Sequence, residues 1–184
     1  MRILVSIFIS LFSLSCAYEL GYKSKNLPGE HTVINIPMFT NETKIVGAET
    51  YFTNELKRQF YRSKIANISD NAPVKIIGKI RRIYIDQDAR GSKEDFPNLP
   101  ANTVITTSYN MTIDVKIEMI RKSDEKTIWQ SEFSDFLLYS GAQLKLEGVN
   151  SSNTIYNQSA VKNNIQKLAN IMMSEAHNRL TENF

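Results

Sequence analysis

The stretch 108–122, SYNMTIDVKIEMIRK, constrains the fold more than any other part of the chain. Apolar residues occupy every second position from Tyr109 to Met119. A period of two places them on one face of a β-strand and the residues between them on the other. The intervening residues are Asn110, Thr112, Asp114, Lys116 and Glu118. This strand is therefore expected in a sheet with one covered and one solvated face.

Other segments supply the partners of this strand. Apolar and β-branched runs predict strands at 32–37, 74–86 and 127–139, the last with Trp129, Phe133 and Leu137 facing inward. In the run 74–86 the apolar pattern changes phase, which predicts a bulge near Gly78 that turns Ile83 and Ile85 inward.

Two segments have the period of a helix. Phe52, Leu56 and Phe60 recur every four residues and predict a helix over 48–65. A stripe from Val161 to Leu180 that includes Met172 predicts a long terminal helix, capped by Ser159 or Asn157.

These elements predict an α+β fold. In the order βαβββα, two helices pack on one face of a four-stranded mixed sheet and form a two-layer sandwich. A right-handed crossover makes the first two strands parallel, and two hairpins follow. Two long connections, 86–102 and 140–157, then leave the same end of the sheet, and loops of this length are usually functional or disordered.

The N-terminus has the composition of a secretory signal. One basic residue, Arg2, precedes an apolar run of about 12 residues, whereas a membrane-spanning helix needs roughly 20. Ser15 and then Cys16, the only cysteine, follow this run. They resemble a bacterial lipobox, whose cysteine is acylated with chains such as palmitate. The alternative is cleavage elsewhere, which leaves Cys16 as a free thiol in an oxidising compartment.

The predicted organisation has three parts. Residues 1–15 are a signal peptide, 16–31 a lipidated cysteine with its tether, and 32–184 a single α/β domain. Ala17 occupies the position at which aspartate retains enteric lipoproteins in the inner membrane, so the outer membrane is favoured. The net charge of +3 is too small to predict nucleic-acid binding.

The sequence contains no pattern of catalytic residues and no metal-ligand spacing. His31 and His177 are far apart and are expected to be exposed. We therefore predict neither an enzyme nor a bound cofactor. Basic residues of the two long connections, Arg90, Lys93 and Lys145, are predicted to gather with Lys44 and to bind phosphate. The alternative is scattered solubilising charges, offset by nearby acids such as Asp88, Glu94, Asp95 and Glu147.

Several motifs, in order, resemble the LptE family of lipopolysaccharide-assembly lipoproteins. They are Cys16 with the nearby Gly21 and Tyr22, the segment LPG at 27–29, IPMFTNET at 36–43, the helix AETYFTNELKRQF, and the hairpin SYNMTIDVKIEMI with KTIWQSEFS. The resemblance implies a protein on the periplasmic face of the outer membrane, held by its lipid. It also implies that the protein plugs the β-barrel LptD, helps it to assemble and aids lipopolysaccharide transport. Given that function, we expect the phosphates bound by Arg90, Lys93 and Lys145 to be those of lipopolysaccharide.

A second family competes for the same sequence. The pattern formed by Pro37, Phe39, Asn41 and Thr43 also resembles LpoB and CsgG-like lipoproteins. Those proteins bind a cell-wall synthase or form a secretion assembly, so this motif alone leaves both functions open.

Overall fold

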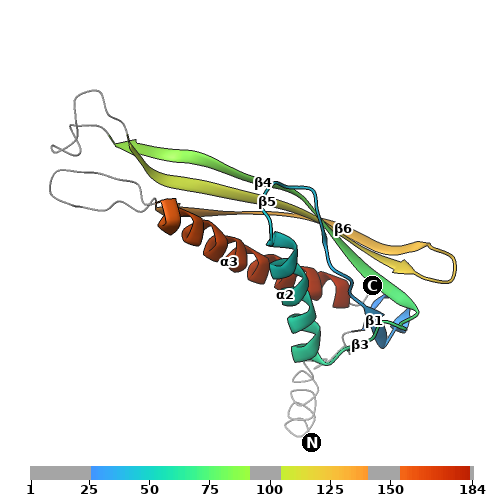
Figure 1. The fold of residues 1–184 in the computed structure, drawn as a ribbon. Coiled ribbons are helices and arrows are strands. Elements are labelled where there is room, and N and C mark those ends of the chain that lie inside the picture. The colour runs from blue at the N-terminus through green and yellow to red at the C-terminus, as the bar shows by residue number, and fades with distance from the viewer. Residues whose placement is uncertain (1–25, 92–104, 141–153, 183–184) are drawn as a thin grey trace, which may run out of the picture.

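Three long antiparallel strands form the frame of the molecule (Figure 1). A computed structural model of the protein describes residues 26–91, 105–140 and 154–182. The long strands are β4 (Val74–Gly91), β5 (Ile105–Arg121) and β6 (Thr127–Ser140). The predicted strand at 74–86 is therefore too short, because its pairing with β5 continues to Gly91.

Three short strands complete a mixed sheet of six strands. β1 (Val33–Asn35) lies parallel between β3 (Asn67–Ile68) and β4, and β2 (Thr40–Asn41) pairs parallel with β4. The parallel and antiparallel pairings agree with the predicted directions. The predicted four strands and the order βαβββα are wrong in detail, because β2 and β3 have two residues each and are too short to produce a sequence pattern.

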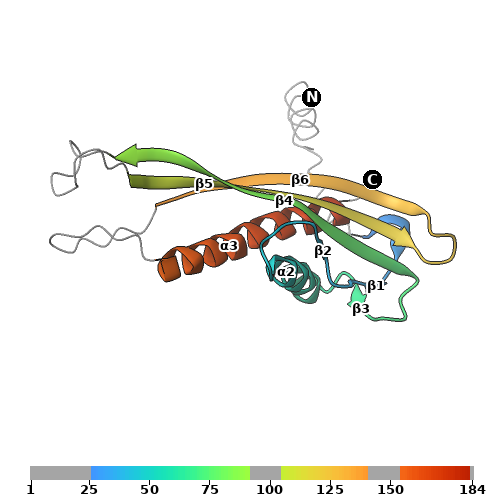
Figure 2. The same ribbon diagram turned by 45° about the horizontal axis from the view of Figure 1, so that its top comes forward.

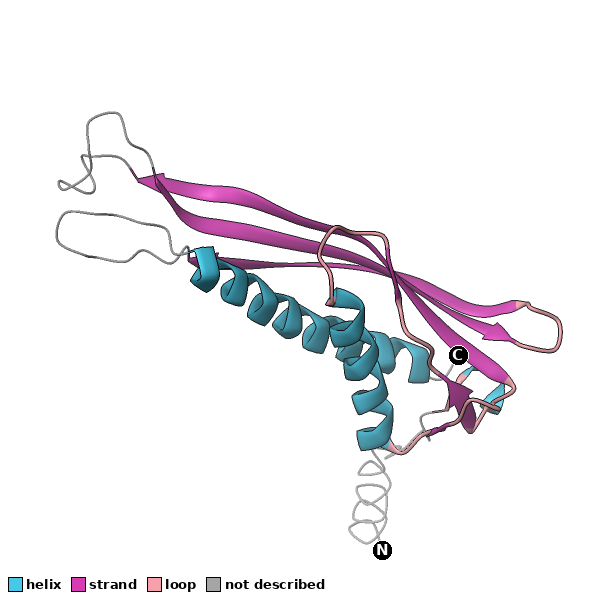
Figure 3. Cartoon of the chain, viewed as in Figure 1, coloured by secondary structure: helices cyan, strands magenta, loops and turns pink. Residues whose placement is uncertain are grey.

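Both long helices, α2 (Ala48–Ser63) and α3 (Thr154–Thr181), lie on the same side of the sheet (Figures 2 and 3). The two-layer α+β arrangement is therefore confirmed. A short 3-10 helix, η1 (Pro28–Glu30), precedes β1. The predicted cap of the terminal helix is wrong, because Asn157 and Ser159 lie within α3, where polar side chains at its surface need not mark an end.

The apolar side chains meet between the sheet and the helices. The central ones are fully buried: Ile34, Phe52, Leu56, Phe60, Ile76, Ile80, Met111, Ile113, Ile117, Met119, Leu168, Met172 and Met173. Trp129 and Leu137 pack against this cluster, and Phe133 belongs to it, as predicted. Leu27 is also in the core at 3% exposure, so packing begins before β1.

The irregularity in β4 lies a little beyond the predicted place. The register with β5 shifts between Ile80 and Arg82 instead of at Gly78, and Ile83 and Ile85 then pack against the core. Gly78 has a different role, because a Cβ built there would lie 2.2 Å from Cε2 of Phe39. The glycine therefore makes room for the Phe39 ring, and the bulge follows two residues later.

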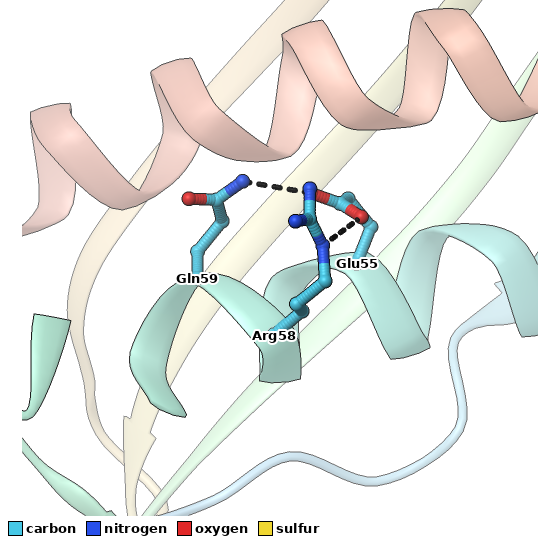
Figure 4. Close-up of polar contacts among 3 residues, drawn as sticks. All are labelled: Glu55, Arg58 and Gln59. Atoms are coloured by element: carbon cyan, nitrogen blue, oxygen red, sulfur yellow. Dashed lines mark hydrogen bonds and ion pairs between the residues drawn. The ribbon is translucent and has the colours of Figure 1, made fainter. Parts of the chain in front are cut away.

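A polar cluster occupies the side of α2 that is turned toward α3 (Figure 4). The Glu55 carboxylate accepts hydrogen bonds from Arg58 Nε at 2.8 Å and from Gln59 Nε2 at 2.7 Å. Burial acts to raise the pKa of Glu55, but these hydrogen bonds and the nearby positive charges outweigh it and lower the pKa. The cluster is thus held in its charged form between the two helices.

Candidate functional site: the uncovered face of the sheet

The face of β4, β5 and β6 that is turned away from α2 and α3 is covered by no described element (Figure 2). We call it the outer face. Cross-strand pairs place its residues in rows across the sheet, because paired residues point to the same side. The rows are Arg82, Asp114 and Ser134; Tyr84, Thr112 and Phe136; and Asp86, Asn110 and Leu138.

The first row of the outer face is held by charge. Asp114 accepts a hydrogen bond from Arg82 Nε and one from Ser134 Oγ, each at 2.7 Å, so its carboxylate bridges all three strands. Two further ion pairs lie nearby, between Lys116 and Glu118 at 2.8 Å and between Arg81 and Glu132 at 2.9 Å. The predicted polar face of β5 is thus confirmed, because Asp114, Lys116 and Glu118 are partly exposed and form ion pairs.

The next two rows carry large apolar side chains in solvent. Tyr84 is 54% exposed, Phe136 60% and Leu138 54%. Aromatic and aliphatic groups beside ordered polar groups are typical of protein interfaces. Oδ1 of Asn110 is buried in this region without a hydrogen-bond partner in the described chain, and such an acceptor is costly. The outer face therefore combines polar and apolar groups in a way that suits a protein partner.

Only one of the predicted phosphate ligands can be placed. Arg90 is exposed and pairs with Thr106 near the end of β4, whereas Lys93 and Lys145 lie outside the described residues. Their segments leave from one end of the sheet, since Gly91 pairs with Ile105 and Ser140 with Ser108.

Lys44 does not join this end, and that part of the prediction is wrong. It follows β2, which pairs with Lys79 and Ile80. Ile80 precedes Arg90 by ten residues along β4. At about 3.3 Å per residue these positions are roughly 33 Å apart. Cys16 lies outside the described residues, as do Glu94, Asp95 and Glu147.

The prediction of an exposed His177 is also wrong. This residue is 6% exposed, its Nε2 lies 2.8 Å from Ser63 Oγ, and its ring packs edge-on against Phe60. The contacts join the end of α2 to α3. In the described ranges, no group of three or more histidine, cysteine or acidic side chains could bind a metal ion.

Two tyrosines stack near the end of the sheet from which the long connections leave. Tyr109 and Tyr139 have ring centroids 5.4 Å apart. Burial, and then the neighbouring Tyr109, raise the pKa of Tyr139 above its ordinary value of 10.0. The phenol is therefore neutral at physiological pH and contributes a stacked aromatic surface.

The motif shared by the two competing families has a structural role. Asn41 donates to Ile45 O and to Glu49, and its Oδ1 accepts from the N–H and hydroxyl of Thr43. Phe39 covers Gly78. Since these contacts shape the loop between β2 and α2, the motif indicates a fold and does not distinguish the two functions.

Nowhere in the described ranges is a helix long and apolar enough to cross a membrane.

The fold and the outer face define a class: a small α+β domain whose exposed surface, and not a cluster of reactive groups, is its most distinctive feature. The family model LptE, described as Lipopolysaccharide-assembly, matches residues 31–181. The chain belongs to the LptE family.

Comparisons with solved structures concern the fold alone. The PelC dodecamer from Paraburkholderia phytofirmans aligns at 11% identity and a TM-score of 0.50, over 82% of this chain and 89% of that chain. A minor lipoprotein from Acinetobacter baumannii aligns at 11% identity and 0.44, over 82% and 96%. Lipoprotein GNA1162 from Neisseria meningitidis aligns at 9% and 0.43, over 76% and 99%. No curated protein matches the chain by sequence.

Proposed function

We propose that this chain is an outer-membrane lipoprotein that plugs an LptD-like β-barrel, assists the assembly of that barrel and aids lipopolysaccharide transport to the cell surface. Membership of the LptE family supports the proposal. The outer face is the observation that carries it. A barrel of this kind has a polar interior, and a plug must present groups that can hydrogen-bond to it.

The ordered charges of the outer face suit such an environment. Asp114 is already satisfied by Arg82 and Ser134, so burying this row against a partner does not strand an unpaired charge. The exposed Phe136 and Leu138 can then supply apolar contact area beside it. This mixture favours a non-enzymatic binding role over a reactive one.

The second part of the proposal concerns the anchor. Cys16 carries acyl chains that hold the protein on the periplasmic face of the outer membrane. One chain alone binds a membrane only marginally, and two or more hold it stably. In this proposal residues 1–15 are the signal peptide, and the tether that begins at Cys16 ends before Leu27, which is buried in the core.

The third part concerns the lipid. Arg90, Lys93 and Lys145 contact the phosphates of lipopolysaccharide at the end of the sheet from which their segments leave. The exposed position of Arg90 at the end of β4 supports this role. The nearby Asp88, which accepts a hydrogen bond from Ser108, limits the net positive charge there.

Purification of the full-length chain from detergent-solubilised outer membranes tests the proposed plug. We expect a large β-barrel in equal amount with the wild-type chain. Phe136→Arg combined with Leu138→Arg should reduce its recovery at least tenfold. Lys57→Glu on α2 is the matched surface control and should retain it. Recovery of the wild-type chain as a monomer without a barrel would reject the plug.

The anchor and the phosphate contacts are tested separately. Mass spectrometry of the mature protein should show acyl chains on Cys16 and none after Cys16→Ser. Lipopolysaccharide binding should weaken in Arg90→Ala with Lys93→Ala and Lys145→Ala. Unchanged binding would exclude these three residues as phosphate ligands without affecting the proposed plug.

A further inference from the structure

The strand β6 lies at one edge of the sheet, and no described element pairs with its outer side. In the described chain it pairs only with β5, although it is 14 residues long. Natural proteins usually protect an edge of this length with lysine, proline or a covering element. Thr127–Ser140 contains no lysine, arginine or proline, and its only charged residues are Glu132 and Asp135. Among the described residues the edge is thus open to pairing except near Asp135, whose charged side chain is on the helix side of the sheet and protects the edge locally.

One hydrogen bond shows which amides face the edge. The Phe136 N–H donates to Oδ1 of the preceding Asp135 at 2.8 Å, so it does not serve the ladder with β5. Amides alternate between the two sides of an antiparallel strand. The N–H groups of Ser134 and Leu138 therefore face the edge as well, one on each side of the Phe136 N–H that Asp135 occupies.

A groove runs beside this edge, between β6 and α3. It has a volume of about 590 Å³ and is lined by Leu137, Asn163, Gln166, Lys167, Asn170 and Ile171. Leu137 is on the helix side of the sheet, opposite Met111, and Ile171 is 51% exposed. A strand added to β6 would therefore place alternate side chains over Leu137 and Ile171.

The groove also has a charge preference. Lys167 is its one charged lining residue and makes no ion pair with a described carboxylate. Asn163, Gln166 and Asn170 add amide groups around it. An acidic side chain of an incoming strand would complement this ammonium.

We propose that the β6 edge and the α3 groove bind an extended segment of a partner protein by β-strand addition. Main-chain hydrogen bonds to β6 supply affinity. An apolar side chain at Leu137 and Ile171, together with an acidic one at Lys167, supplies specificity. The edge presents main-chain groups of β6, whereas the outer face presents side chains of the same strand, and the proposal does not depend on the plug.

The probe is the blocked peptide acetyl-Thr-Val-Thr-Glu-Thr-Val-Thr-Val-Thr-amide, whose valines and glutamate share one face of a strand, titrated into the full-length chain in detergent. We expect a Kd of about 0.1 to 1 mM, with NMR shifts confined to β6 and residues 163–171. A peptide methylated at alternate amide nitrogens should bind at least tenfold more weakly. Leu138→Pro removes one edge donor and should weaken binding, whereas Leu138→Ala, its matched control, should not.

Charge reversal tests the groove. Lys167→Glu should weaken binding of the glutamate peptide at least fivefold and strengthen binding of the same peptide with lysine in place of glutamate. Lys162→Glu, elsewhere on α3, is the control. Equal binding of the methylated peptide, or no binding at 1 mM, would overturn the proposal. A dimer through β6 that the peptide does not dissociate would identify a second copy as the occupant and also overturn it.

Discussion

The two faces of the long strands differ in burial, although their residues alternate along the same stretch of sequence. On the face toward the helices, Met111, Ile113 and Val115 are buried under α2 and α3. On the outer face, Thr112 and Asp114 lie between them and are partly exposed. The comparison teaches that the covered face determines stability, while the outer face is available for a partner. Each prediction below compares a change on one face with a matched change elsewhere.

The largest difference is expected between neighbours in β5. Ile113→Ala leaves a cavity under the helices and should lower the free energy of unfolding by about 2 to 5 kcal/mol. Thr112→Ala, one residue away on the outer face, should change it by about 0.5 kcal/mol or less. Urea unfolding of both variants measures the contrast. Equal losses would show that the faces are not energetically distinct.

The contact of Phe39 with Gly78 gives the next largest effect. Gly78→Ala brings a methyl group into the Phe39 ring and should cost about 1 to 3 kcal/mol. Because the cause is a clash, Phe39→Leu in the same chain should recover part of the loss. Lys79→Ala, exposed on the same strand, is the control. A Gly78→Ala protein as stable as wild type in urea would contradict this packing.

The Glu55 cluster predicts a dependence on acid. The pKa of Glu55 is lowered below its ordinary value of 4.5 in the folded protein. The contribution of the Glu55 carboxylate to stability is therefore complete above pH 4.5 and is lost as the pH falls through the pKa of the folded state. Glu55→Gln should cost about 1 to 2 kcal/mol at pH 7 and progressively less toward pH 3. Glu175→Gln, in the exposed pair with Arg179, is the control. A loss that is the same at pH 7 and pH 3 would refute this account.

The ion pair of the outer face should have the smallest effect on stability. A double-mutant cycle of Arg82→Ala and Asp114→Ala should give a coupling of about 0.2 to 1 kcal/mol, because Arg82 is largely exposed. Salt should reduce it further. A coupling above 2 kcal/mol would mean that the outer face contributes to folding more than its exposure suggests.

The covered face could be predicted from sequence because burial has a period. The alternation in β5 and the stripe in α2 identified Met111, Ile113, Phe52 and Phe60 correctly. The same reasoning failed for β2 and β3, which are held by pairing with distant strands and have no period of their own. The sequence reasoning also placed the bulge at Gly78 and not between Ile80 and Arg82. It read this glycine as a mark of the bulge, because nothing in the sequence links Gly78 to the Phe39 ring, 39 positions away, for which it makes room.

The candidate site could be predicted only in part. Alternation identified the polar residues of β5, but the patch formed by Tyr84, Phe136 and Leu138 depends on the register of three strands. His177 was missed because its partner, Ser63, lies on another helix. A mixed run such as FLLY in β6 could have indicated exposed apolar groups, since consecutive residues cannot all face the core.

Crosslinking from the outer face in cells tests the central claim most directly. A photoreactive amino acid at Phe136 is compared with one at Tyr61, which is similarly exposed on α2. The proposed function predicts an adduct with a large outer-membrane barrel from Phe136 that is stronger than any from Tyr61. No barrel adduct from Phe136 in a chain that is folded and present in the outer membrane would contradict it.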